Sequence, residues 1–172
     1  MPHVVVGART DVGHHRSLNE DALLVGERVW VVADGMGGHT GGSQAAQIAV
    51  DTARDSLTQK PLQVNLYEQL RATFSRIDSN IRERAQRETG LSNMGTTGVA
   101  ALLLPHEMVH LYIGDSRLYH FRDGVEIYRT KDHSVVRYLE DEGLLTEEEA
   151  KVNFFSLSFI VVVLLFTSSL RD

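Results

Sequence analysis

The most informative segment of this chain is Val29-Trp30-Val31-Val32-Ala33-Asp34-Gly35-Met36-Gly37-Gly38-His39. Its first five residues are apolar, and their β-branched and aromatic side chains are typical of a core strand. We expect the strand to end at Asp34, and the three glycines among the next four residues leave backbone that can approach a ligand closely. A carboxylate in this position suits a hard cation bound by oxygen atoms. An ordinary turn between a strand and a helix is the alternative interpretation.

A second acidic cluster lies thirteen residues upstream, where Glu20 and Asp21 precede the apolar run 22–25. The intervening Gly26-Glu27-Arg28 predicts a hairpin turn. Antiparallel pairing of the two runs would bring Glu20, Asp21 and Asp34 to the same end of a sheet. Converging carboxylates repel one another unless a cation lies between them, and an all-oxygen set favours Mg²⁺ or Mn²⁺ over zinc or copper. A solvated acidic rim at the sheet edge is the alternative.

Two helices are predicted to follow. The first is expected to be capped by Thr40 and to end before Pro61, and its apolar residues fall at helical spacing: Ala46, Ala49, Val50, Ala53 and Leu57. The second is expected from about residue 62 to residue 87, with one apolar face formed by Leu66, Leu70, Phe74, Ile77 and Ile81. Both faces are interpreted as core-facing.

The remaining pattern indicates short strands. One strand is expected at residues 3–8, and four more at 98–104, 108–113, 116–121 and 125–129, the last two joined by Arg122-Asp123-Gly124 as a hairpin loop. Hairpin-linked strands that follow two adjacent helices predict an α+β fold, with antiparallel sheet and the helices segregated on one face.

Composition excludes several classes of protein. The chain has 172 residues, a net charge of −6 and no cysteine. The negative charge argues against a nucleic-acid partner, and the absence of cysteine excludes disulfides, thiolate zinc sites and a cysteine nucleophile. The N-terminus shows no secretory signal pattern, so a cytoplasmic protein is expected.

Four motifs occur in order along the chain: Thr10-Asp11-x-Gly13-x-x-Arg16-x-x-Asn19-Glu20-Asp21, Asp34-Gly35-Met36-Gly37-Gly38-His39, Gly95-Thr96-Thr97 and Gly114-Asp115-Ser116-Arg117. Together they resemble the metal-dependent serine/threonine protein phosphatases of the PPM (PP2C-type) family, in its bacterial form. The resemblance implies an antiparallel β-sandwich flanked by helices, in α/β/β/α layers, with metals at one end between the sheets. It covers residues 1–150, as the N-terminal part of a phosphatase domain, and leaves residues 151–172 as a hydrophobic tail.

The chemistry that the resemblance implies is hydrolysis of phosphoserine and phosphothreonine in proteins by a metal-activated water. Two Mg²⁺ or Mn²⁺ ions are expected. In this interpretation Asp34 bridges both ions, Gly35 offers its carbonyl oxygen, and Glu20 and Asp21 complete the near shell, partly through waters. The partners would be phosphorylated protein substrates and a serine/threonine kinase or its targets, and a monomer is expected.

Asp115 follows a predicted strand and a glycine, as the family's aspartate at a third, weaker metal site does. A turn-capping aspartate is the alternative interpretation. We expect Arg117 and His133 to have structural roles.

Arg16 and His39 are the candidate catalytic residues. The guanidinium of Arg16 is a planar fork of donors that matches two phosphate oxygens, and the resemblance assigns it to the substrate phosphate. A salt bridge to Glu20 or Asp21 is the alternative. His39 is a candidate for proton transfer or substrate contact, because Met36 stands where some eukaryotic relatives carry a histidine. A helix-entry histidine bonded to backbone is the alternative there. His14 and His15 are expected to be solvent-exposed.

The C-terminal segment departs from the family pattern. Family members continue for roughly a third of the domain with two more metal-binding aspartates, whereas Asp172 is the only aspartate here beyond Ala150. The apolar stretch 154–166 is shorter than the ~20 residues that span a bilayer. Three interpretations are open: sequence from a truncated or frameshifted gene, a membrane segment or anchor at 154–170, or a buried strand. The alternative to an enzyme is an inactive relative that binds metal or phosphoprotein without turnover.

Overall fold

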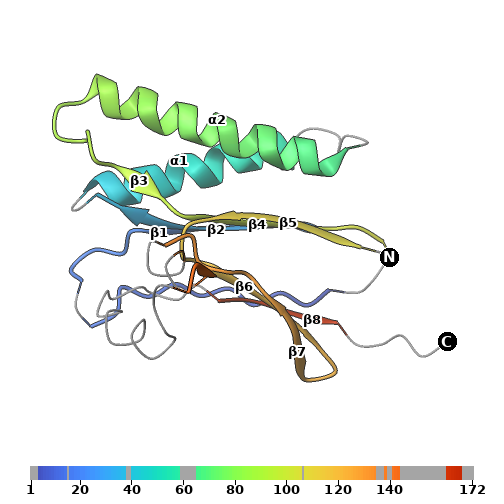
Figure 1. Ribbon diagram of the computed structural model, residues 1–172. Coiled ribbons are helices and arrows are strands. Elements are labelled where there is room, and N and C mark those ends of the chain that lie inside the picture. The colour runs from blue at the N-terminus through green and yellow to red at the C-terminus, as the bar shows by residue number, and fades with distance from the viewer. Residues whose placement is uncertain are drawn as a thin grey trace. The chain divides into compact units, whose positions relative to one another are not determined.

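The computed structural model (Figure 1) describes residues 4–14, 16–37, 40–58, 65–105, 107–134, 138, 141–143 and 162–167. The chain forms two compact units, residues 1–111 and residues 112–172. The expected α+β class, with sheets and adjacent helices, is confirmed.

The first unit is built on a sheet with strand order β1-β2-β4-β5. Its strands are β1 (Asp21–Val25), β2 (Val29–Met36), β4 (Gly98–Leu103) and β5 (Met108–Ile113), of which residues 108–111 belong to this unit, and the short β3 (Gly95–Thr96) also pairs with β2. β1 and β2 form the predicted antiparallel hairpin, closed by a hydrogen bond of 2.9 Å from the Gly26 amide to the Val29 carbonyl. β2 runs two residues past the expected end at Asp34, because Gly35 and Met36 pair with β3.

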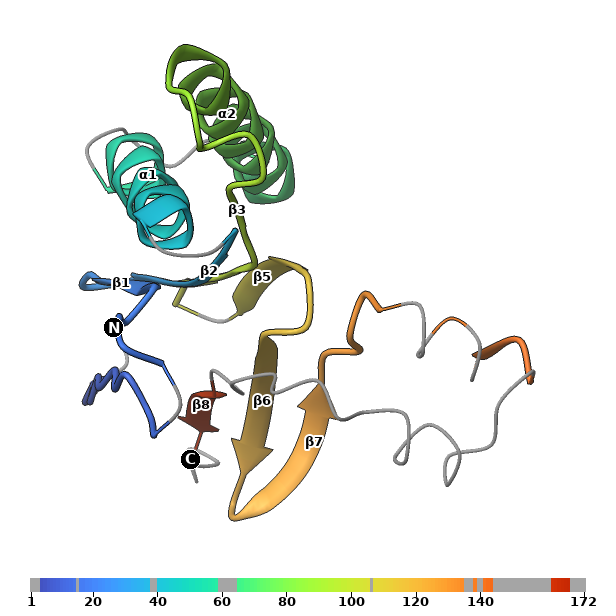
Figure 2. The same ribbon diagram turned by 90° about the vertical axis from the view of Figure 1, so that its left-hand side faces the viewer.

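Two helices cover one face of this sheet (Figures 1 and 2). They are α1 (Thr40–Leu57) and α2 (Leu66–Arg87). The predicted α1 face is buried throughout, and α2 buries Leu70, Ile77 and Ile81, with Leu66 and Phe74 packed partly buried against the core. Every second residue of β1 and β2 joins this core: Ala22, Leu24, Val29, Val31 and Ala33.

The helix starts differ slightly from the prediction. Thr40 is the first helical residue of α1 rather than a cap before it. α2 starts at Leu66 because Asn65 caps it, and its side-chain oxygen accepts a hydrogen bond of 3.2 Å from the Glu68 amide. Residues 62–64, where the helix was expected to begin, lie outside the described residues, as does Pro61.

The strand predicted at residues 3–8 is wrong for the part that the structure describes. Residues 4–8 have no regular secondary structure, and Val5 is 86 % exposed. β-branched side chains favour a strand only where a neighbouring strand and a packed face receive them.

The second unit contains a three-stranded sheet of order β7-β6-β8. Its strands are β6 (Arg117–Arg122), β7 (Val125–Arg129) and β8 (Val162–Thr167). β6 and β7 form the predicted hairpin, and Asp123 and Gly124 have the positive φ of 51° and 80° that a tight two-residue turn requires.

β8 pairs with β6 in parallel, so this sheet is mixed rather than wholly antiparallel as expected (Figure 2). Residues 162–167 form a strand, and the rest of the segment 154–170, on which the three interpretations of the C-terminal segment depend, lies outside the described residues. No helix in the described part of the chain is long and apolar enough to cross a membrane.

Candidate active site

The structure brings the two predicted aspartates face to face. In the antiparallel register of β1 and β2, Asp21 lies directly opposite Asp34. Opposite residues of such a pair have Cα atoms about 4.5–5.5 Å apart and point to the same face. Since the neighbouring pair Ala22–Ala33 points into the helix-covered core, the two carboxylates lie on the other face of the sheet. Like charges in this position destabilise a sheet unless a cation lies between them.

Asp34 is held through its backbone by the motif Gly95-Thr96-Thr97. The Asp34 amide donates to the Thr97 hydroxyl (3.2 Å), and the Asp34 carbonyl accepts from the Thr97 amide and the Thr96 hydroxyl (2.9 Å each). The side chain of Asp34 is 13 % exposed. The sequence indicated this motif but not its role, which depends on a pairing between segments far apart in the chain.

Asp21 is held by the loop that precedes β1. The Thr10 hydroxyl donates to Asp21 Oδ2 (3.3 Å) and accepts from the Asn19 amide group (2.7 Å). The side-chain oxygen of Asn19 in turn accepts from the Asp21 backbone amide (3.0 Å). The first motif of the sequence is therefore a local network around one carboxylate.

Arg16 lies beside these carboxylates. Its Nη1 is 3.0 Å from Glu20 Oε2 and 4.0 Å from Asp34 Oδ1. The salt bridge to Glu20 that the sequence offered as an alternative is present. The side chain of Arg16 remains 37 % exposed, so the guanidinium can still be reached from solvent.

Two glycines allow the end of β2 to approach the first turn of α1. A Cβ atom on Gly35 would lie 2.0 Å from the Gly42 carbonyl oxygen, and one on Gly42 would lie 2.5 Å from Glu20 Oε1. The Gly35 amide also donates to the Glu20 carbonyl (3.1 Å). The sequence predicts that a ligand approaches the glycines after Asp34, whereas the close neighbour of Gly35 in the structure is the first turn of α1.

The residues at this edge fit part of a divalent-metal site. In the described part of the chain no group of three or more histidine, aspartate or glutamate side chains is arranged to hold a metal ion. Asp21 and Asp34 nevertheless supply opposed carboxylate oxygens, and Mg²⁺ is commonly held by one or two carboxylates while it keeps several waters. The donor set therefore suits a hard, largely hydrated cation.

Asp115 lies in the second unit, half-buried in the turn between β5 and β6. The segment that follows β7 braces this turn. The backbone amide of His133 donates to the Gly114 carbonyl (2.9 Å), and its ring stacks on Tyr112 with centroids 4.7 Å apart. Arg117 donates two hydrogen bonds to Asp132, from Nε (2.6 Å) and Nη2 (2.5 Å), and they raise its pKa above the usual value.

Of the other predicted histidines near these motifs, the structure describes only His14. His14 is exposed, as expected. His39, the candidate for proton transfer, and His15 lie outside the residues that the structure describes.

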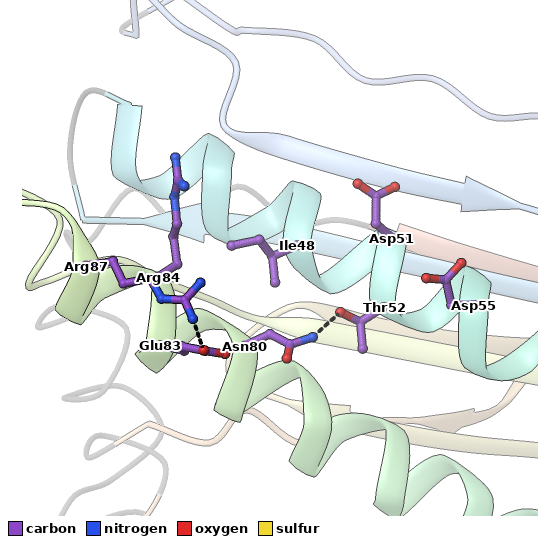
Figure 3. A pocket seen from close by; sticks show the side chains of 8 residues that line it. All are labelled: Ile48, Asp51, Thr52, Asp55, Asn80, Glu83, Arg84 and Arg87. Atoms are coloured by element: carbon purple, nitrogen blue, oxygen red, sulfur yellow. Dashed lines mark hydrogen bonds and ion pairs between the residues drawn. The ribbon is translucent and has the colours of Figure 1, made fainter.

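A groove of ≈ 310 Å³ runs between the two helices (Figure 3). Two pairs of its side chains contact each other, Arg87 with Glu83 and Asn80 with Thr52, and Arg84 forms an ion pair with Glu88 outside the groove. None of the predicted site residues lines it: the groove residues are Ile48, Asp51, Thr52, Asp55, Asn80, Glu83, Arg84 and Arg87.

Comparison with known proteins identifies the family. Residues 12–155 match the model of the family described as protein phosphatase 2C. The chain belongs to the protein phosphatase 2C (PP2C) family. The resemblance read from the four motifs is thus confirmed.

Bacterial PP2C phosphatases are similar to this chain in sequence. It is 39 % identical over 143 residues to the serine/threonine protein phosphatase PstP of Mycobacterium tuberculosis, covering 83 % of this chain and 28 % of PstP. It is 36 % identical over 150 residues to the serine/threonine phosphatase stp of Listeria monocytogenes, covering 83 % of this chain and 60 % of that protein.

Solved PP2C structures share the fold. The catalytic domain of PstP in complex with two manganese ions matches with a TM-score of 0.74 and 38 % identity, over 83 % of this chain and 61 % of that domain. Stp1 of Staphylococcus aureus matches with a TM-score of 0.74 and 31 % identity, over 86 % and 63 % of the two chains. The chain therefore spans less than two thirds of the length of these PP2C relatives.

Proposed function

We propose that this chain hydrolyses phosphoserine and phosphothreonine in proteins with the help of divalent cations. The observation that carries the proposal is the opposed pair Asp21–Asp34 with the guanidinium of Arg16 beside it, 4.0 Å from Asp34. Support comes from membership in the PP2C family and from the two manganese ions in the similar PstP structure.

Asp21, Asp34 and the carbonyl oxygen of Gly35 would hold the cation. When bound, it would supply a water of lowered pKa and would neutralise charge on the phosphoryl oxygens. We further propose two such ions and a weaker third site at Asp115, with Mg²⁺ or Mn²⁺ as the metal.

Arg16 binds the substrate phosphate in this proposal. A guanidinium positions phosphate by paired, charge-assisted hydrogen bonds and stabilises negative charge that develops on the phosphoryl oxygens. Thr10 and Asn19 orient Asp21, and Thr97 fixes the backbone of Asp34, so that the carboxylates are set before the substrate arrives.

A second candidate function is binding of metal or phosphoprotein without turnover. In the part of the chain that the structure describes, no three metal-binding side chains form a cluster, and this observation favours the second candidate.

The experiment is a titration of the purified chain with Mn²⁺ and Mg²⁺, with hydrolysis of a phosphothreonine peptide and of p-nitrophenyl phosphate as the readout. Asp34→Asn is the test variant, and Asp55→Asn on the exposed side of α1 is the matched control. Metal-dependent turnover that Asp34→Asn abolishes and Asp55→Asn retains is the expected result. Metal binding without turnover in folded protein would favour the second function, and no metal binding would contradict both metal proposals.

A further inference from the structure

We propose that Glu20 is a positioning residue that aims Arg16 at the substrate phosphate, rather than a ligand of the metal. The inference rests on the proposed function for the role of Arg16. The contact between the two side chains is independent of that function and can be measured by itself.

Both carboxylate oxygens of Glu20 have defined surroundings. Oε2 accepts a hydrogen bond of 3.0 Å from Arg16 Nη1. Oε1 is buried without a hydrogen-bond partner and faces the first turn of α1, where a Cβ atom on Gly42 would approach it to 2.5 Å. Since Glu20 is only 9 % exposed, its carboxylate is enclosed between the guanidinium and the helix.

The helix end explains why a carboxylate is tolerated in this place. The first amides of an α-helix have no partner within the helix, and its N-terminus carries partial positive charge. Gly42 is the third residue of α1, so Glu20 Oε1 lies where that charge is felt. Arg16 and the helix end together offset the burial of Glu20.

The enclosure also limits the movement of Glu20. On one side the backbone of Gly42 is too close to permit a side chain, and on the other the Glu20 carbonyl is tied to the Gly35 amide (3.1 Å). Because the carboxylate of Glu20 is fixed, its hydrogen bond can restrict the conformations of the Arg16 side chain. Arg16 lies outside regular secondary structure, and its long side chain would otherwise lose rotamer freedom on binding phosphate.

The first test measures the contact without metal or substrate. Phenylglyoxal labels exposed guanidinium groups, and peptide mass spectrometry follows the rate at Arg16, with Arg9 in the same digest as the internal reference. Glu20→Gln is expected to raise the rate at Arg16 about threefold or more, because a charge-assisted hydrogen bond is lost. The matched control is Glu27→Gln, at an exposed position in the β1–β2 turn. An unchanged rate in Glu20→Gln would overturn the proposal.

The second test separates aiming from metal binding. Inorganic phosphate binding is measured by calorimetry and Mn²⁺ binding by electron paramagnetic resonance. Glu20→Gln is expected to weaken phosphate binding roughly tenfold and to leave the Mn²⁺ affinity within about twofold. In an Arg16→Lys background, Glu20→Gln is expected to have no further effect on phosphate.

Two outcomes distinguish the proposals. A loss of Mn²⁺ affinity in Glu20→Gln, or a phosphate effect that persists in Arg16→Lys, would show that Glu20 acts through the metal and would overturn the inference. A wild-type chain that binds no Mn²⁺ would contradict the proposed function, whereas the labelling result would still decide the contact. Glu20→Asp keeps the charge but withdraws it from Arg16, and serves as a second variant if Glu20→Gln does not fold.

Discussion

Replacing Gly35 with alanine is expected to destabilise the first unit strongly. A Cβ atom at this position would lie 2.0 Å from the carbonyl oxygen of Gly42, 2.3 Å from its carbonyl carbon and 2.6 Å from the carbonyl oxygen of Glu20. All three neighbours are backbone atoms, so no flexible side chain can move aside. Either β2 or the first turn of α1 must retreat by about 1 Å, since real Cβ atoms keep at least 3.0 Å from other heavy atoms.

The magnitude follows from what such a retreat disrupts. Overpacking a rigid interior costs about 1–3 kcal/mol. The shift would also strain the hydrogen bond from the Gly35 amide to the Glu20 carbonyl (3.1 Å) and the pairing of Gly35 with Thr96, at roughly 1 kcal/mol for each bond weakened. We therefore expect a loss of about 3–5 kcal/mol in the free energy of unfolding.

The assay is urea unfolding followed by tryptophan fluorescence. Trp30 is the only tryptophan of the chain, lies in β2 and is buried, so its emission reports the unfolding of the first unit. Gly7→Ala is the matched control, because nothing lies within 4 Å of a Cβ atom there and its φ is not positive. The control is expected to change stability by less than about 1 kcal/mol. If Gly35→Ala and Gly7→Ala unfold with free energies within 0.5 kcal/mol of each other, roughly the spread of ordinary surface substitutions, the close-approach argument is refuted.

Three further predictions concern the helix cap, the brace and the effect of pH. Asn65→Ala is expected to cost about 1 kcal/mol in the same urea assay, since it removes the acceptor for the Glu68 amide. Asp132→Asn breaks the two-bond pair with Arg117 and is expected to speed amide hydrogen exchange in β6 at least several-fold, with Asp141→Asn as the exposed control. Burial and the nearby Arg122 lower the pKa of His120 in the folded chain. The unfolded chain therefore binds more protons just below pH 6.5, and the free energy of unfolding decreases as the pH is lowered through this range. The thermal midpoint of His120→Gln is expected to fall less than that of the wild type between pH 7.5 and pH 5.5, and an equal fall would contradict this assignment.

Contacts that are local in sequence could be predicted. The β1–β2 hairpin and the apolar faces of α1 and α2 follow from spacing within short windows, and the structure confirms them. The extension of β2 to Met36 depends on β3, and the parallel pairing of β8 depends on β6. These partners lie far along the chain, and periodicity carries no information about them. The strand expected at residues 3–8 is absent from the described residues 4–8 for the same reason, because a β-prone run needs a neighbouring strand with which to pair.

The candidate site also combines contacts that the sequence predicts with contacts that only the structure shows. Asp21 and Asp34 are separated by a single hairpin, so their opposition follows from turn position and antiparallel register alone. The support of Asp34 by Thr97 and the enclosure of Glu20 by Gly42 are tertiary contacts between distant motifs. The motif resemblance indicated that these residues belong to one site, and only the structure shows which atoms meet.

The glycines of this edge connect the fold to the proposed chemistry. Two carboxylates held opposite each other, one of them 13 % exposed, weaken the sheet that carries them. The same edge admits no side chain at Gly35 or Gly42, so that the N-terminal turn of α1 can press against Glu20, which in turn holds Arg16 near Asp34. A requirement for stability alone does not explain why three carboxylates and a guanidinium lie together beside the close backbone contacts at Gly35 and Gly42. Local conflict of this kind is expected where a site is prepared for a cation, because the bound cation relieves the repulsion between Asp21 and Asp34 that the fold maintains.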